Sequence, residues 1–319
     1  MKDIRKTIET CEIPHTRFQE LYCHLKGSIE DALDGHDPQI EVLVGPSRVG
    51  KTILLRALER DFPETTVDGK KHVPVLFVPL DPGVSPKLLP TNVLVALDAP
   101  IPKKKLSVID MNQLMQRQLQ LAGTKVILLE EASHLVEESS RMHPQEASDW
   151  VKYTSDMLRL TIVLTGVPRL NRLIQGSQQL NLRATDSLEF RPYNSSSQSD
   201  MMSYASCVSS YLKIFGEAGF QCDVPLESVV KNSYLVSAGL LGVLSKLMIN
   251  LCKFIEREPR PRPLTLADFQ AAAQRTRTAG NPLCQPFQRM EVPAMEMFQC
   301  HAYALEEAGL TAKYSGALL

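Results

Sequence analysis

The sequence predicts an α/β fold, in which a five-stranded parallel sheet with intervening helices is followed by a small all-helical domain. Three observations predict it. Apolar runs of strand length alternate with segments of helical periodicity up to residue 190, as expected of a parallel sheet. A glycine-bounded loop joins the first apolar run to a helix. After Tyr193 a serine-rich linker is followed by helical patterns alone.

The glycine-bounded loop carries the clearest functional signal. It follows a predicted buried strand at 40–44, fits the pattern G-x-x-x-x-G-K-[ST] and precedes a helix. Glycines let the backbone curl until its N–H groups point at phosphate oxygens, and the helix N-terminus adds partial positive charge. We expect Lys51 to reach the β- and γ-phosphates of ATP and the Thr52 hydroxyl to hold Mg²⁺. The alternative is an ordinary strand-to-helix turn, and the flanking strand and helix count against it. The predicted nucleotide-binding residues are Gly45, Pro46, Ser47, Arg48, Val49, Gly50, Lys51 and Thr52.

Composition narrows the class of protein. The chain is 44% hydrophobic and 22% charged, which is ordinary for a globular protein. It has no apolar run long enough to span a membrane and no apolar signal segment at its start, so we expect no membrane partner and a cytoplasmic location. The scattered cysteines favour free thiols. The net charge of −1 means that any contact with nucleic acid must come from a local basic patch.

The segment before the first strand has two interpretations. Apolar residues three or four apart predict an amphipathic helix from His15 to Leu33. Ile13 and Phe18 stand at the start of that helix. They are either part of a helix lead-in that begins after Pro14, or an apolar slot for the nucleotide base.

A lysine run stands between the second and third predicted strands. The second strand spans 73–78, and a proline-rich stretch with one short helix follows it. Lys103, Lys104 and Lys105 then precede a capping-box pattern, Ser107-x-x-Asp110, that opens a helix. Adjacent lysines at a helix entrance are either a solvated loop or a contact for a phosphate backbone.

Two carboxylates end the third predicted strand, 125–129. Open α/β sheets place ligand chemistry at the carboxyl ends of their strands. In phosphate-loop ATPases the first carboxylate supports Mg²⁺ and the second polarises the attacking water, which here would be Glu130 and Glu131. The first is usually Asp, so Glu130 changes the reach to the metal by one methylene group. Thr165 ends the fourth strand and would lie beside Glu131 if these two strands are neighbours.

Four segments are expected: an N-terminal helical lead-in (1–37), the α/β nucleotide-binding core (38–193), a helical lid (194–279) and a C-terminal extension (280–319). Leu188-Glu189-Phe190 predicts the last short strand of the core. Within the lid, Gly239 and Gly242 at a helix start allow a close backbone approach. The predicted lid helices span about 201–216, 225–236, 240–256 and 265–278, with one more in the extension at about 292–308.

A phosphate-loop core followed by a compact helical lid is the plan of AAA+ ATPases. From Ile13 to Thr278 the chain resembles the TniB/TnsC family of transposition regulators, AAA+ ATPases of Tn7-like and CRISPR-associated transposons. In its short length, the chain is most similar to the family members from type I-F CRISPR-associated transposons. The resemblance rests on Ile13-Pro14-His15, Gly45 to Thr52, Glu130-Glu131 with His134-Leu135, Thr165-Gly166-Val167-Pro168-Arg169 and Gln179-Leu180-x-x-Arg183.

The resemblance implies a ring or helical homo-oligomer that uses ATP and Mg²⁺, encircles double-stranded DNA, and links a TniQ-type target selector to a TnsA/TnsB-type transposase. It implies that Glu131 activates water, that Thr165 is the sensor and that Arg183 is the arginine finger acting in the neighbouring subunit, with Arg169 as a second candidate. No arginine stands in the helical turn directly after Gly242, so the sensor of the lid stays unassigned. Lys103, Lys104, Lys105 and Arg141 are the predicted DNA contacts.

Two other functions remain open at this level. A helicase-loader-type AAA+ ATPase would share the core and bind single-stranded DNA. A nucleotide-gated scaffold would use ATP to hold the ring with little hydrolysis, because Glu130 replaces the usual Asp. A preference for single-stranded over double-stranded DNA would distinguish the helicase loader from the transposition regulator. Hydrolysis that does not depend on Glu131 would indicate the scaffold.

Overall fold

The structure is a computed structural model that describes residues 4–11, 13, 15–103, 105–256, 258 and 260–310. It divides into two compact units, each described here by itself. The α/β unit comprises Arg17–Gly45 and Lys51–Phe190. The helical unit comprises the described residues of Met1–Thr16, Pro46–Gly50 and Arg191–Leu319.

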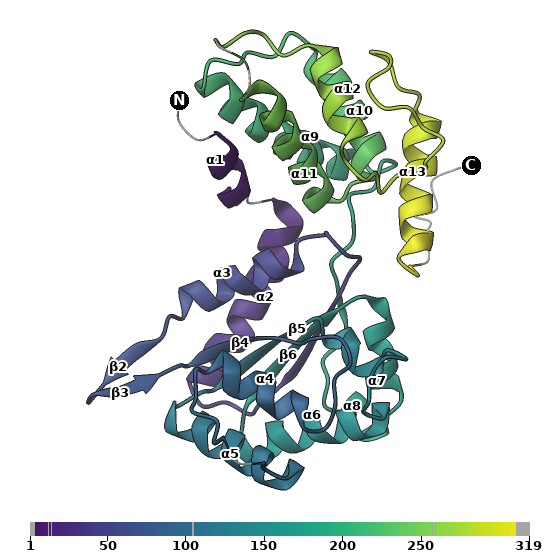
Figure 1. Cartoon of the computed structure of the whole chain (residues 1–319). Helices are drawn as coiled ribbons and strands as arrows, with labels where there is room; N and C mark the ends of the chain where they lie inside the picture. Colours follow the sequence, from purple (N-terminus) through teal and green to yellow (C-terminus); the bar gives the residue numbers. More distant parts are fainter. Residues whose placement is uncertain are drawn as a thin grey trace. The chain divides into compact units, whose positions relative to one another are not determined.

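The α/β unit is built on a five-stranded sheet with the order β4-β5-β6-β1-β7 (Figure 1). Every neighbouring pair in it is parallel, which confirms the predicted sheet. The central strands are buried along their whole length, because helices cover both faces of a parallel sheet. The strands are β1 (Ile40–Val44), β4 (Val75–Pro79), β5 (Val126–Glu130), β6 (Thr161–Gly166) and β7 (Leu188–Glu189).

Helices of this unit flank the sheet and pack against its Val, Ile and Leu side chains. The predicted capping box at the start of α5 is present, with Ser107 accepting from the backbone of Asp110 and Asp110 accepting from the backbone of Ser107. The helices are α2 (Thr16–Leu33), α3 (Lys51–Asp61), α4 (Leu88–Ala96), α5 (Val108–Leu121), α6 (Pro144–Leu158), α7 (Asn171–Gln175) and α8 (Gln178–Asn181), with short 3-10 helices η1 (Ala132–Val136) and η2 (Pro168–Leu170).

A two-stranded antiparallel hairpin, absent from the sequence analysis, follows α3. It consists of β2 (Thr65–Val67) and β3 (Lys70–His72) and extends away from the sheet (Figure 1). Its strands are three residues long and largely exposed, so they lack the apolar alternation by which a strand is recognised in a sequence.

The helical unit holds the five helices that its apolar periodicity predicts, together with α1. Its core is formed by buried tyrosine, phenylalanine and leucine side chains of these helices. The helices are α1 (Ile4–Thr10), α9 (Gln198–Glu217), α10 (Leu226–Ser237), α11 (Leu241–Ile255), α12 (Leu266–Gln274) and α13 (Ala294–Glu307).

Two helix boundaries differ from the predicted ones by three residues or more. The helix predicted from about 201 begins as α9 at Gln198. The predicted helix 265–278 ends as α12 at Gln274. The Asn250 side chain of α11 donates to the carbonyl oxygen of Arg275 and to the hydroxyl of Thr276, each at 3.0 Å. These bonds from a neighbouring helix fix the chain as it leaves the helical path.

No single helix among the described residues is long and apolar enough to cross a membrane. The helices α10 and α11 reach the length and apolar composition of a membrane span only when they are taken together, and the chain bends by 113° between them.

Candidate nucleotide-binding site

The predicted phosphate loop lies between β1 and α3. It connects Val44, the last residue of β1, to Lys51, the first residue of α3. Gly50 has a φ of 123°, a conformation that side chains other than glycine rarely adopt. Arg48 also has a positive φ, 66°. The loop therefore has the irregular backbone that lets successive N–H groups converge on an anion.

Within the helical unit, the start of α11 holds this loop. The Gly242 N–H donates to the carbonyl oxygen of Arg48 at 2.9 Å. A β-carbon at Gly242 would lie 2.5 Å from that oxygen, so only glycine permits the contact. Gly239, with a φ of 82°, packs as tightly against the backbone of Tyr193. The close approach expected of this glycine pair is thus made to the phosphate loop and to the chain at residue 193.

Lys51 is 5% exposed, and its Nζ donates to the Gly45 carbonyl oxygen at 2.9 Å. Burial lowers the pKa of Lys51, while the charges of Glu131 and Glu130 oppose that shift. The lysine is therefore enclosed by the loop with two carboxylates in electrostatic range. A bound triphosphate would add negative charge beside this buried ammonium group.

A hydroxyl and a carboxylate meet at the start of α3. The Thr52 hydroxyl donates to a carboxylate oxygen of Glu130, which ends β5. Hard oxygen ligands of these two kinds suit Mg²⁺, whose remaining positions are commonly filled by phosphate oxygens and water. The residues present therefore fit a Mg²⁺ ion, and the longer side chain of Glu130 does reach Thr52. A cluster of three or more His, Cys, Asp or Glu ligands does not occur among the described residues, and Mg²⁺ held with a nucleotide does not need one.

Glu131 follows directly, with a φ of 53°. A non-glycine residue in this left-handed region is strained, and such strain concentrates at functional sites. The turn leads the chain out of the sheet into η1. It places Glu131 at the carboxyl edge of the sheet.

Thr165 lies on β6, which pairs with both β5 and β1. The condition that these two strands are neighbours is therefore met. The Thr165 side chain is fully buried, and its hydroxyl donates to the carbonyl oxygen of Leu129 at 3.3 Å. This bond ties the ends of the two strands together one residue before the Glu130-Glu131 pair.

Both arginines that the sequence singled out are paired within the same chain. Arg183, next to the end of α8, pairs with Asp156 of α6, and its side chain is 47% exposed. Arg169 pairs with Glu137 at 3.3 Å, and Glu137 also contacts His134 at 2.8 Å. Partly exposed ion pairs of this kind are worth about 0–1 kcal/mol, so either arginine can exchange its partner for a stronger anion.

The remaining predicted residues belong to other segments of the two units. Phe18 stacks on Tyr22 of the same helix, with ring centroids 6.1 Å apart. Ile13 is half-buried in the helical unit, whereas Phe18 lies in the α/β unit. Lys103, Lys105 and Arg141 are exposed, and Lys104 lies outside the described residues.

Three features of the site were missed in the sequence. The first is the contact of Gly242 with Arg48. The second is Gly166, where a β-carbon would lie 2.9 Å from the backbone nitrogen of Ser133, so that glycine lets η1 pack on the end of β6. The third is Glu137, which holds His134 and Arg169 together. Each of these features includes a contact between residues that are far apart in the chain. A local sequence pattern does not reveal such contacts.

Comparison with known proteins identifies the family. The family model described as "Bacterial TniB protein" matches residues 4–189, more than half of the chain. The chain belongs to the TniB family. A search of curated proteins gives no match.

Solved structures show which fold this TniB-family protein shares. Cdc6p from Pyrobaculum aerophilum matches with a TM-score of 0.63 at 13% identity, covering 85% of this chain and 70% of that one. The ORC2 protein of Aeropyrum pernix in its ADP form matches with a TM-score of 0.61 at 13% identity, covering 85% and 72%. The ORC1 protein of the same organism, in complex with DNA, gives 0.56 at 18% identity, covering 85% and 69%. The TniB-family chain thus has the fold of the AAA+ ORC and Cdc6 proteins.

Proposed function

We propose that this TniB-family protein is an ATPase. The observation that carries the proposal is the meeting of Thr52 with Glu130 beside the buried Lys51. Lys51 would bind the β- and γ-phosphates, Thr52 and Glu130 would hold Mg²⁺, and the loop N–H groups would orient the phosphate chain. Bound MgATP supplies the phosphoryl group that is transferred to water. Ile13 and Phe18 are the proposed base contacts.

In the proposed hydrolysis, Glu131 accepts a proton from the attacking water, and Thr165 senses the γ-phosphate. Arg183 would act in the neighbouring subunit, where its guanidinium neutralises charge that develops on the γ-phosphate. Its pairing with Asp156 supports this role, because the pair keeps Arg183 at the surface with a partner that a triphosphate can replace.

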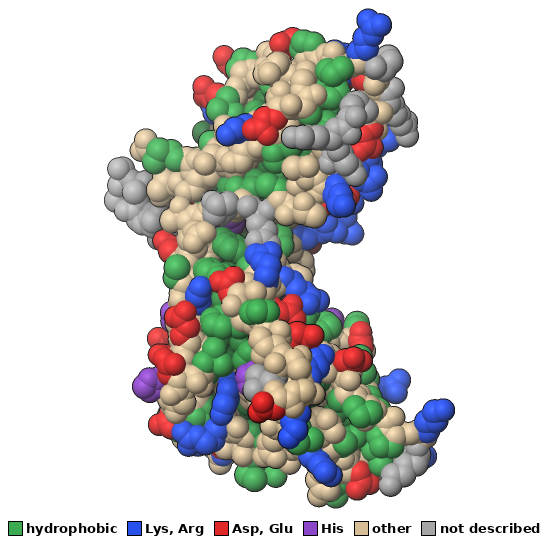
Figure 2. All heavy atoms as spheres, turned by 90° about the vertical axis from the view of Figure 1, so that its left-hand side faces the viewer, with side chains coloured by type: hydrophobic (Ala, Val, Ile, Leu, Met, Phe, Trp, Pro, Cys, Tyr) green, Lys and Arg blue, Asp and Glu red, His purple; other side chains and the backbone are tan. Residues whose placement is uncertain are grey.

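We further propose that the protein regulates DNA transposition as a ring or filament on double-stranded DNA. The TniB family name supports this, and one structure of the same fold is a complex with DNA. On the face shown in Figure 2, basic and acidic side chains are interspersed, so a DNA contact on this face would rest on a small patch repeated in every subunit. Lys103, Lys105 and Arg141 are exposed and would supply it together with Lys104.

The proposed role extends to partners and setting. The assembled protein would link a TniQ-type target selector to a TnsA/TnsB-type transposase in the cytoplasm, in a Tn7-like, type I-F CRISPR-associated transposon. Hydrolysis would control how long the assembly stays on DNA.

The test is electron microscopy of the purified protein with duplex DNA, with and without a slowly hydrolysed ATP analogue. The proposal predicts nucleotide-dependent rings or filaments on the duplex that are lost in Lys51→Ala and Arg183→Ala. Assembly only on single strands would favour the helicase-loader alternative. Monomers under every condition would contradict the proposed assembly.

A further inference from the structure

Two cysteine sulfurs lie in contact in the helical unit, away from the phosphate loop. The Sγ atoms of Cys284 and Cys300 are 3.6 Å apart. A disulfide requires about 2.05 Å, so the sulfurs need to approach by only about 1.5 Å, which small side-chain rotations supply. Cys300 is buried on α13, and Cys284 is partly exposed in the segment that precedes this helix.

Backbone contacts hold this pair in place. The chain just before Cys284 is fixed to α10, because Ala279 N–H donates to Val236 at 2.8 Å. It then passes directly over α13, where a β-carbon at Gly280 would lie 2.9 Å from the Cys300 sulfur. Beyond Cys284, the Phe287 N–H donates to the Asn232 side chain at 2.6 Å. The segment is therefore anchored to α10 on both sides of Cys284.

The second cysteine, Cys300, lies on α13, which also contacts α10. On α13, the residue after Cys300 is His301, whose Nδ1 lies 3.2 Å from the hydroxyl of Tyr234 on α10. Both sulfurs thus belong to elements docked on one helix. The folded structure of the helical unit therefore holds the two sulfurs close together.

We propose that Cys284 and Cys300 form a modification site, at which a peroxide oxidises the two thiols to an intramolecular disulfide that fastens α13 to the segment anchored on α10. The proposal is independent of nucleotide binding. It uses a thiol pair to which the phosphate-loop chemistry assigns no role.

The reaction is balanced in two steps. The partly exposed Cys284 sulfur attacks hydrogen peroxide, the O–O bond breaks, and a sulfenic acid and one water form. The Cys300 sulfur then attacks the Cys284 sulfur, the S–O bond breaks, and the departing hydroxide takes the Cys300 proton as a second water. The two sulfurs together lose two electrons, and the peroxide gains them.

The order of the steps follows from exposure. Cys284 is partly exposed, whereas Cys300 is buried, so dissolved peroxide reaches the Cys284 sulfur and not the Cys300 sulfur. Burial also raises the pKa of the Cys300 thiol to about 12, so this thiol passes its proton to the departing hydroxide as it attacks. Cys284 meets the oxidant first, and Cys300 resolves the sulfenic acid. The product joins residues 16 positions apart, and such a link stabilises a fold by restricting the unfolded chain.

Peptide mapping tests the proposal on the full chain. The folded protein is treated with hydrogen peroxide, quenched with catalase, alkylated under denaturing conditions and digested with trypsin. Because Arg289 stands between the cysteines, a disulfide would join the tryptic peptides 278–289 and 290–313. We expect this linked pair to dominate, to disappear with dithiothreitol, and to raise the melting temperature of the oxidised protein by on the order of 5 °C.

Two variants sharpen the experiment. Cys284→Ser removes the partly exposed thiol and should abolish both the linked pair and the rise in melting temperature. Cys23→Ser removes an exposed thiol of α2 and should leave both unchanged. Oxidation of Cys284 to sulfinic or sulfonic acid without the linked pair, or equal yields from folded and urea-unfolded protein, would overturn the proposal.

Discussion

The backbone N–H of Gly242 lies 2.9 Å from the carbonyl oxygen of Arg48, and this bond joins the start of α11 to the phosphate loop within the helical unit. It provides a direct path by which the conformation of the loop can affect the helices. Arg48 carries a positive φ, so the loop is held in a conformation that its own sequence does not favour. The contact therefore preorganises the phosphate loop.

Gly242→Ala tests this contact. The added β-carbon would lie 2.5 Å from the Arg48 oxygen, and either the loop or α11 must move. If the loop moves, we expect ATP affinity to fall at least 10-fold. If α11 moves, we expect the free energy of unfolding to fall by about 1–3 kcal/mol. Gly27→Ala in α2 is the matched control, since nothing lies within 4 Å of its added carbon, and it should preserve binding. Equal ATP affinity and melting temperature in Gly242→Ala and the wild type would show that the contact is dispensable.

The Thr52–Glu130 contact predicts how the metal is bound. Glu130→Ala should leave metal-free nucleotide binding within about twofold of the wild type and lose most of the gain in affinity that Mg²⁺ provides. Glu130→Asp, which restores the usual side chain, should keep that gain. Titration of a fluorescent ATP analogue with and without Mg²⁺ measures both. A full Mg²⁺ effect in Glu130→Ala would remove Glu130 from the metal site.

The proposed action of Arg183 in the neighbouring subunit predicts complementation between two inactive variants. Lys51→Ala lacks the phosphate contact and Arg183→Ala lacks the proposed finger, so each alone should hydrolyse ATP at least 100-fold more slowly. In a mixture, an Arg183→Ala subunit can receive the intact finger of a Lys51→Ala neighbour, and part of the activity should return. Arg159→Ala, which removes another exposed and paired arginine, is the control and should stay active. A mixture as inactive as its components would contradict action between subunits.

The exposed lysines predict a salt-dependent interaction with duplex DNA. Replacing Lys103 and Lys105 with Ala should weaken binding to all duplex sequences alike and lower the slope of log affinity against log salt by about 0.9 for each lost contact. Lys213→Ala removes an exposed charge of the helical unit and should leave the slope unchanged. Fluorescence anisotropy at several salt concentrations gives the slopes, and identical slopes for the double variant and the wild type would exclude these lysines as contacts.

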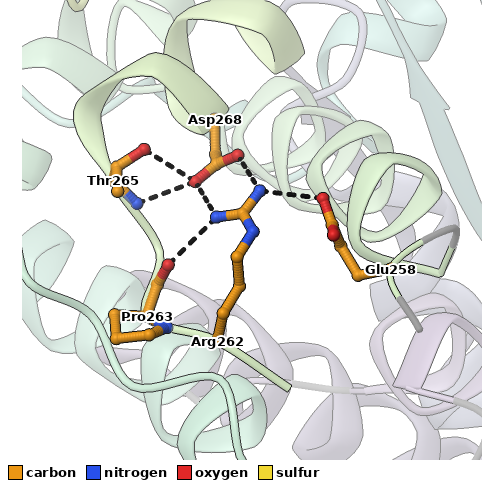
Figure 3. Close-up of polar contacts among 5 residues, drawn as sticks. All are labelled: Glu258, Arg262, Pro263, Thr265 and Asp268. Carbon is orange, nitrogen blue, oxygen red and sulfur yellow. Dashed lines mark hydrogen bonds and ion pairs between the residues drawn. The ribbon is translucent and has the colours of Figure 1, made fainter. Parts of the chain in front are cut away.

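A polar network at the start of α12 predicts acid sensitivity of the helical unit (Figure 3). Asp268 accepts two hydrogen bonds from Arg262, at 2.7 and 2.8 Å, and two more from Thr265, each at 2.8 Å. Arg262 chiefly holds the pKa of Asp268 at about 2, below the ordinary 3.8.

Because this folded-state pKa lies below the value in the unfolded chain, the stabilisation is complete above about pH 4 and is lost as the pH falls toward 2. Asp268→Asn should cost about 2 kcal/mol at pH 6, and the difference in melting temperature from the wild type should shrink at pH 2.5. A difference that does not change with pH would show that the carboxylate charge is unimportant.

The sequence predicted the parts of the fold that local pattern controls. β1, β5 and β6 each contain at least three consecutive apolar residues, and the loop before Lys51 has a fixed spacing of glycines, so their positions follow from local chemistry. The hairpin β2–β3 was not predicted, because its exposed strands are too short for a periodic signal. The end of α12 was predicted too late in the chain, because Asn250, on another helix, determines it.

The candidate site was predictable as a set of residues and not as a set of contacts. Lys51, Thr52, Glu130 and Glu131 follow from motif spacing, and the parallel sheet brings the ends of their strands to one edge. The ion pairs of Arg183 and Arg169 join residues on separate elements, and side-chain length and helix orientation decide them. Gly242 was recognisable as a point of close approach, but its partner depends on the tertiary fold.

The most direct measurement of the central claim is phosphate release by the wild type and Glu131→Gln in the presence of duplex DNA, with ATP binding measured in parallel. Glu131→Gln preserves size and polarity while removing the base. The account predicts unchanged ATP affinity and a rate at least 100-fold lower in the variant. Equal rates, or a wild type that binds ATP without appreciable hydrolysis, would contradict the account and leave a nucleotide-gated scaffold.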